Sequence, residues 1–128
     1  MARILLVEDN PQNMKLASVI LRKAGYEVIA AVDSDEAESS IEAQLPDLIL
    51  MDLGLPGKDG YTLTRELKRR PRTAGVPILA VTSYAMKGDE AKARDAGCSG
   101  YLAKPIDRLE LLRTVRSLVE ANEEGEVT

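Results

Sequence analysis

The sequence of 128 residues contains no histidine. The chain therefore cannot offer an imidazole as a general base, as a zinc ligand or as a phosphorylated carrier. Its single cysteine, Cys98, excludes a disulfide within the chain, and the sequence forms no Cys/His cluster for a metal. Any histidine chemistry in the function of this protein must come from a partner.

Aromatic residues are also scarce, and basic residues are fewer than acidic ones. Phe and Trp are absent and four tyrosines are the only aromatic residues, so the core must be aliphatic. At this length the chain suits one domain, which buries roughly two thirds of its unfolded surface. The net charge of −4 disfavours a nucleic acid or an anionic membrane as a partner. Because no secretory signal and no apolar run of membrane-spanning length is present, we expect a cytoplasmic protein.

What the sequence does contain is a regular alternation of two patterns. Short apolar runs are typical of parallel strands that are covered on both faces, and they lie at 4–7, 28–32, 48–51, 78–81 and 101–103. Each run is followed by a stretch with the apolar spacing of a helix, the first of which begins with the capping signal Asn10-Pro11. The alternation predicts one (βα)5 domain over residues 1–121 and an acidic, disordered tail at 122–128.

Five βα units predict an α/β fold, with an open, doubly wound parallel sheet of five strands and helices on both faces. Ligands bind such sheets at the carboxyl ends of the strands. The strand order cannot be read from the sequence, but the order 2-1-3-4-5 makes the first and third strands neighbours. We adopt this order because those two strands end in acidic residues, Glu8-Asp9 and Asp52.

Four of the five strands end in side chains that suit the handling of a phosphoryl group. Besides Glu8, Asp9 and Asp52, Thr82 ends the fourth apolar run and Lys104 follows the fifth. Three gathered carboxylates repel one another, so at least one should have a raised pKa, and a divalent cation would relieve the repulsion. Mg²⁺ fits best, because it prefers oxygen ligands and keeps positions for water and phosphate oxygens.

In this arrangement Asp52 is the expected nucleophile, and its attack on phosphorus would form an acyl phosphate. Lys104 would supply a fixed positive charge and Thr82 a hydroxyl to the phosphoryl oxygens. Each residue also has an ordinary interpretation, such as a helix cap for Thr82 or a turn residue for Asp52. Their joint occurrence at strand ends favours the functional interpretation, because independent caps and turns would not produce this set.

The residues at the strand ends stand in five short motifs, Val7-Glu8-Asp9-Asn10, Leu50-Met51-Asp52, Leu55-Pro56-Gly57-Lys58-Asp59-Gly60, Val81-Thr82-Ser83 and Lys104-Pro105. Together these motifs resemble the receiver domain of two-component response regulators, which has the flavodoxin-like fold also called CheY-like. The resemblance extends over residues 3–119, and the stretch from Ala85 to Cys98 looks most like that of the single-domain DivK-type cell-division regulators.

The resemblance implies that Asp52 accepts a phosphoryl group from a phosphohistidine on a sensor histidine kinase or a histidine phosphotransfer protein. It implies that Asp9, Asp52 and the backbone carbonyl of Gly54 bind Mg²⁺, with Glu8 reaching the ion through water. The protein would then be a signalling phosphoacceptor rather than an enzyme, although it assists its own phosphorylation and its slow dephosphorylation.

On the output side, the resemblance implies that Thr82 and Lys104 contact the phosphoryl group and that Tyr101 turns inward. This would alter the surface of the fourth helix, the fifth strand and the fifth helix, to which a downstream protein binds. A cis peptide bond between Lys104 and Pro105 is also implied. Tyr84 is expected to screen the acyl phosphate from water.

The alternatives differ in how well the sequence supports them. A phosphorylation-independent adaptor, or a receiver excised from a hybrid kinase, stays open. A flavin-binding module is disfavoured, because nucleotide phosphates need backbone donors where this chain has Glu8 and Asp9. A haloacid-dehalogenase-like phosphatase needs a second aspartate at position 54, which is glycine. The basic run Lys68–Arg72 is typical of a solvated helix end rather than a nucleic-acid site.

Overall fold

The structure, a computed structural model, describes residues 2–83 and 88–127, and side chains up to residue 122. Within these ranges the chain alternates five strands with five helices, which confirms the predicted (βα)5 pattern. The strands are β1 (Arg3–Val7), β2 (Glu27–Ala31), β3 (Leu48–Asp52), β4 (Ile78–Thr82) and β5 (Gly100–Ala103). The helices are α1 (Pro11–Lys23), α2 (Ser34–Ala43), α3 (Gly60–Arg69), α4 (Asp89–Ala96) and α5 (Arg108–Val127).

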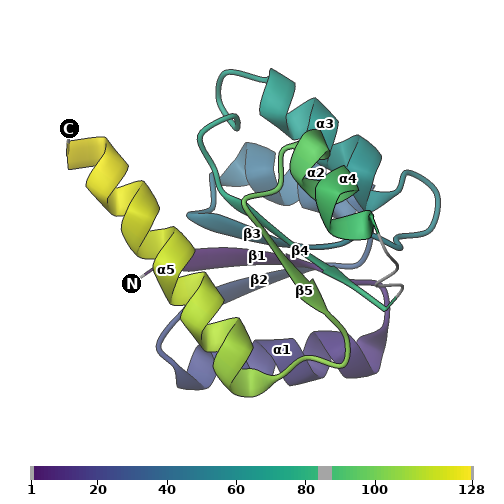
Figure 1. Ribbon diagram of the computed structural model, residues 1–128, viewed down its shortest axis with the longest axis vertical. Helices are drawn as coiled ribbons and strands as arrows, with labels where there is room; N and C mark the ends of the chain where they lie inside the picture. The colour runs from purple at the N-terminus through teal and green to yellow at the C-terminus, as the bar shows by residue number, and fades with distance from the viewer. Residues whose placement is uncertain (1, 84–87, 128) are drawn as a thin grey trace.

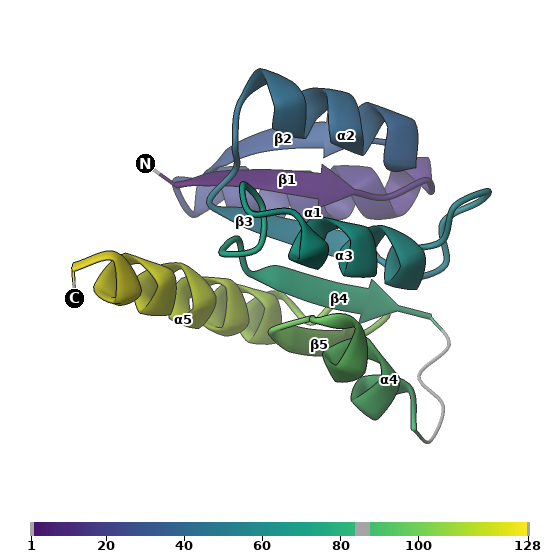
Figure 2. The ribbon, with the colours of Figure 1, turned by 90° about the horizontal axis from the view of Figure 1, so that it is seen from above.

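The five strands form a parallel sheet in the order β2-β1-β3-β4-β5, which confirms the adopted order. The register places Val7 of β1 beside Met51 of β3. Glu8 and Asp52 follow these two residues, so they leave the sheet side by side. All the carboxyl ends lie at one edge of the sheet, and the two ends of the chain lie at the other (Figure 2).

Helices cover both faces of the sheet (Figure 1). Helices α1 and α5 pack on one face, and α2, α3 and α4 pack on the other. Strands β3 and β4 are buried along their whole length, which explains why their sequences lack polar alternation. Successive side chains of a strand enter opposite clusters, as Leu50 and Met51 do. The sheet is therefore the centre of the molecule, and its strands β3 and β4 are enclosed by helices on both faces.

Local capping signals determine where the helices next to the site begin. The side chain of Asn10 accepts hydrogen bonds from two backbone N–H groups of α1, and Pro11 is the first helical residue, as the sequence predicted. Asp59 caps α3 by accepting a hydrogen bond from the N–H of Thr62. These caps fix the ends of the loops that follow β1 and β3.

Helix α5 continues to Val127, past residue 121, where the sequence analysis ended the domain. Residues 122–127, part of the segment 122–128 expected to be an acidic, disordered tail, have helical backbone in the structure. The physical reason is local, because three of the residues 122–127 are glutamates, which have high helix propensity, and an existing helix is extended at little cost. The periodic spacing of apolar residues shows only that one face of a helix is buried. Its loss after Glu120 therefore does not mark the end of the helix.

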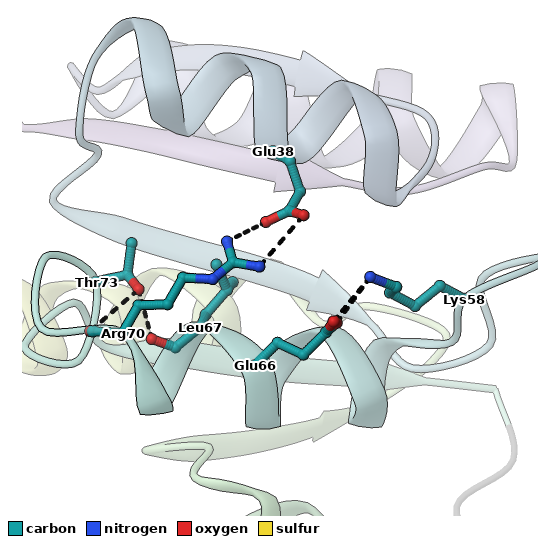
Figure 3. A network of polar contacts seen from close by, with 6 residues as sticks. All are labelled: Glu38, Lys58, Glu66, Leu67, Arg70 and Thr73. Atoms are coloured by element: carbon teal, nitrogen blue, oxygen red, sulfur yellow. Dashed lines mark hydrogen bonds and ion pairs between the residues drawn. The ribbon is translucent and has the colours of Figure 1, made fainter.

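The basic run Lys68–Arg72 has a structural explanation. Lys68 donates two hydrogen bonds to backbone carbonyls of the loop that follows α3. Arg70 pairs with Glu38 of α2 (Figure 3), and Arg72 donates to a backbone carbonyl of α2. The run fastens α3 and its loop to α2. None of the helices in the described part of the chain has the length and apolarity needed to span a bilayer.

Candidate functional site

Three acidic side chains come together at the carboxyl edge of the sheet. Glu8 and Asp9 follow β1, and Asp52 ends β3. One carboxylate oxygen from each residue lies within 4.8 Å of those of the other two. Glu8 is 4% exposed and Asp52 is 7% exposed, whereas Asp9 is exposed. The cluster therefore has one side against the protein interior and one side open to solvent.

A lysine from the other end of the chain enters this cluster. Lys104 follows β5, and its Nζ lies 2.6 Å from Oε1 of Glu8 and 3.4 Å from Oδ2 of Asp52. The backbone N–H of Lys104 donates to the carbonyl of Thr82, which ties the end of β5 to the end of β4. The peptide bond between Lys104 and Pro105 is cis. One ammonium group thus serves two buried carboxylates.

The electrostatic balance of the site is negative, because three carboxylates face one lysine. Burial raises the pKa of Glu8, and the carboxylate of Asp52 raises it further. Hydrogen bonds from Lys104 and from the backbone N–H of Asn10 lower the same pKa, but the net direction is upward. Desolvation therefore outweighs pairing at Glu8, and the metal-free site holds charge that its own residues do not fully compensate.

Two glycines shape the loop that follows Asp52. The N–H of Gly54 donates a hydrogen bond of 2.9 Å to Oδ1 of Asp52, which orients the carboxylate. Gly60 begins α3, and a Cβ at this position would lie 2.4 Å from the carbonyl oxygen of Asp52 and 2.7 Å from Cα of Leu53. The sequence pattern gives Gly60 no distinct role. Its requirement for glycine follows from the close return of α3 to β3, which the sequence pattern alone does not reveal.

The two residues expected to act as a switch lie on neighbouring strands. The register pairs Asp52 with Val81, so Thr82 is the next residue along β4, and it is buried. Tyr101 of β5 is half-buried against the cluster that α2, α3 and α4 cover. Its buried hydroxyl has no hydrogen-bond partner among the described residues. Tyr84, expected to screen an acyl phosphate, lies outside the described residues.

The donor set of the cluster suits a hard divalent cation. All three side chains present carboxylate oxygens, and the exposed side at Asp9 leaves room for water molecules. Mg²⁺ prefers oxygen ligands and keeps several waters when it binds to proteins. The residues present therefore fit Mg²⁺, as the sequence predicted from their chemistry.

Comparisons with known proteins agree with this geometry. The family model described as "Response regulator receiver domain" matches residues 4–116. The polar-differentiation response regulator DivK of Brucella anthropi is 40% identical over 114 residues, which cover 89% of this chain and 93% of that protein. The predicted similarity to receiver domains, and to DivK among them, is confirmed.

Solved structures extend the same result to three dimensions. One is the receiver domain of a sensor histidine kinase from Pseudomonas aeruginosa, with a magnesium ion coordinated in its active-site cleft. It has a TM-score of 0.85 and 43% identity, and the match covers 93% of this chain and 98% of that one. A putative response regulator from Chloroflexus aurantiacus has a TM-score of 0.89 and 35% identity, with the same coverage. The chain therefore belongs to the family of response regulator receiver domains.

Proposed function

We propose that this receiver domain takes a phosphoryl group onto Asp52 from a phosphohistidine of a partner protein, in a reaction that requires Mg²⁺. The observation that carries the proposal is the buried carboxylate of Asp52, held in a cluster of three acids and one lysine. Such a cluster is suited to bind a cation and then an anion. Because the sequence contains no histidine, the donor imidazole belongs to a sensor histidine kinase or a histidine phosphotransfer protein.

In the transfer, an oxygen of Asp52 attacks phosphorus while the bond from phosphorus to the donor imidazole breaks, which leaves an acyl phosphate on Asp52. When bound, Mg²⁺ would supply positive charge that offsets the repulsion of the carboxylate and the phosphoryl group. Its proposed protein ligands are Asp9, Asp52 and the backbone carbonyl of Gly54. The contacts of Glu8 support an indirect role through water, because its oxygens already accept hydrogen bonds from Lys104 and from a backbone N–H.

Lys104 and Thr82 are the proposed contacts of the phosphoryl group after transfer. The ammonium of Lys104 already lies 3.4 Å from Oδ2 of Asp52, so it can compensate the added negative charge. Movement of Thr82 toward the phosphate would free space for Tyr101 to turn inward. The resulting change at the surface of α4, β5 and α5 would alter the binding of a downstream protein, because only contacts that differ between two states can shift their populations.

In this proposal the protein is a signalling phosphoacceptor rather than an enzyme. The site assists its own phosphorylation and the slow hydrolysis of the acyl phosphate, and each molecule carries its phosphoryl group as a signal. The cytoplasmic location expected from the sequence belongs to the same proposal.

The direct test is incubation with acetyl phosphate and Mg²⁺, followed by intact-mass measurement. We expect the wild-type protein to gain one phosphoryl group, and we expect Asp52→Asn to gain none, because the nucleophilic oxygen is lost. Chelation of Mg²⁺ should also prevent the gain in the wild type.

A matched control is Asp47→Asn, which alters an aspartate at the opposite edge of the sheet, where its side chain accepts a hydrogen bond from the N–H of Arg3. This variant should be phosphorylated like the wild type. Phosphorylation of Asp52→Asn at the wild-type level would show that the acceptor lies elsewhere, and a gain of mass that is insensitive to chelation would remove Mg²⁺ from the proposal.

A further inference from the structure

The loop that joins β3 to α3, residues 53–59, carries the backbone carbonyl proposed as a metal ligand. It leaves the sheet at the end of β3 and returns at Gly60, which packs against the backbone at the same place. The side chains of Leu53 and Leu55 are buried and anchor the first limb of the loop. Residues 56–59 form the second limb, and they are exposed. Any side-chain restraint on the second limb must therefore lie at the surface.

Figure 3 shows such a restraint. The Nζ of Lys58, on the second limb, lies 2.9 Å and 2.8 Å from the two carboxylate oxygens of Glu66 in α3. The two side chains are 36% and 33% exposed. Pairing with Glu66 raises the pKa of Lys58, so the lysine is charged at neutral pH. The pair connects the loop to a helix whose first turn is fixed against the end of β3.

We infer that the ion pair between Lys58 and Glu66 positions this loop for metal binding, and that it raises the affinity for Mg²⁺ without touching the ion. The inference rests on the proposed Mg²⁺ site. The second limb is held at its far end by the cap of Asp59, and without the ion pair residues 56–58 would sample more conformations. Because Leu55 joins these residues to Gly54, binding the ion through the carbonyl of Gly54 would then have to order more of the loop. The pair provides part of this order in advance. Lys58 and Glu66 are therefore positioning residues that act through the carbonyl of Gly54.

A long-range charge effect is the competing explanation, and it predicts a different pattern. Loss of the positive charge of Lys58 would strengthen the binding of a cation, and loss of the negative charge of Glu66 would weaken it. Positioning predicts that both losses weaken binding, because either one breaks the pair. The signs of the two effects therefore separate the explanations.

The experiment measures Mg²⁺ affinity by titration of amide NMR signals in Lys58→Met, in Glu66→Gln and in the double variant, with no phosphodonor present. Exposed ion pairs have small coupling energies, so we expect each single variant to bind Mg²⁺ about two- to fivefold more weakly than the wild type. The double variant should bind no more weakly than the weaker single variant, because both substitutions remove one interaction.

The matched control is Arg70→Met, at the C-terminal end of α3. Like Lys58→Met, it removes one positive charge and breaks one exposed ion pair (Figure 3). Arg70 and its partner Glu38 have side chains that are 46% and 32% exposed, and they join α2 to the opposite end of α3. This variant should retain wild-type affinity. Tighter or unchanged binding in Lys58→Met, or an equal loss in Arg70→Met, would overturn the inference. A wild-type protein that does not bind Mg²⁺ would instead overturn the proposed function on which the inference rests.

Discussion

The two edges of the sheet treat charge in opposite ways. At the amino edge, Arg3 of β1 pairs with Glu27 of β2 at 3.1 Å, and the N–H of Arg3 donates to Asp47 at 2.7 Å. At the carboxyl edge, three carboxylates gather around Lys104, and two of them are buried. At the amino edge the arginine therefore has one carboxylate partner, and the second carboxylate, that of Asp47, is exposed to solvent, whereas at the carboxyl edge two buried carboxylates share one ammonium group.

The edge with the unbalanced buried charge is not the edge with the larger cavity. The amino edge has a cavity of about 260 Å³ between β1, β2 and the end of α2, whereas the space beside Glu8 and Asp52 is about 10 Å³. Empty volume alone would thus direct attention to the wrong edge. The unbalanced charge is the better indicator, because it is costly in the free protein and is relieved only by a ligand of opposite charge.

The largest effect that tests this comparison comes from replacing the basic side chain at each edge, Lys104 or Arg3. Lys104→Met leaves two buried carboxylates without their ammonium partner, so we expect a loss of about 3 kcal/mol in the free energy of unfolding of the metal-free protein. Arg3→Met breaks a pair in which Glu27 is 44% exposed, and it should cost about 1 kcal/mol or less. Urea unfolding in the presence of a chelator measures both. Equal losses would show that the two edges do not differ in this respect.

Added Mg²⁺ should stabilise the folded protein through the carboxylates of the carboxyl edge alone. A ligand present at ten times its Kd raises the free energy of unfolding by about 1.4 kcal/mol, provided that it binds the folded state alone. We expect this gain in the wild type and in Arg3→Met, and its loss in Asp9→Asn, which removes a proposed ligand. Thermal unfolding with and without Mg²⁺ gives the measurement. An undiminished gain in Asp9→Asn would place the ion elsewhere.

The smallest effect concerns the pKa of Glu8, which burial raises above its ordinary value. Between the unfolded and folded pKa values the folded state binds more protons, so this group makes the protein less stable as pH rises through that interval. Glu8→Gln should therefore stabilise the metal-free protein at pH 7.5, by less than the gain expected from Mg²⁺, because the amide carries no charge that burial disfavours. Below the ordinary pKa of 4.5 the gain should vanish. Destabilisation at pH 7.5 would mean that pairing with Lys104 outweighs desolvation.

The sequence predicted the elements well because their signals are local. Strands β3 and β4 read as continuous apolar runs since both faces of each are covered, and Asn10 and Pro11 mark the start of α1 by capping chemistry that involves only adjacent residues. The end of α5 was harder to predict, because helix can continue without a buried face.

The site was predictable in its composition but not in its contacts. The residue types at the strand ends were enough to predict a divalent cation and a phosphoryl group as ligands. The hydrogen bond between Glu8 and Lys104 joins residues 96 positions apart. A pattern of neighbouring residues cannot show that two such distant positions are in contact. Nor does it show that Gly60 packs against the backbone of Asp52.

By itself, then, the sequence determined which segments become strands and helices and which chemical groups end the strands, because propensity, capping and periodicity act over a few residues. Only the tertiary structure decided which of those groups meet. Strand order placed the end of β1 beside the end of β3, and the fold brought Lys104 across from β5. The reason is physical, because burial and charge interaction depend on distance in space, and the packing of helices on both faces of the sheet sets that distance.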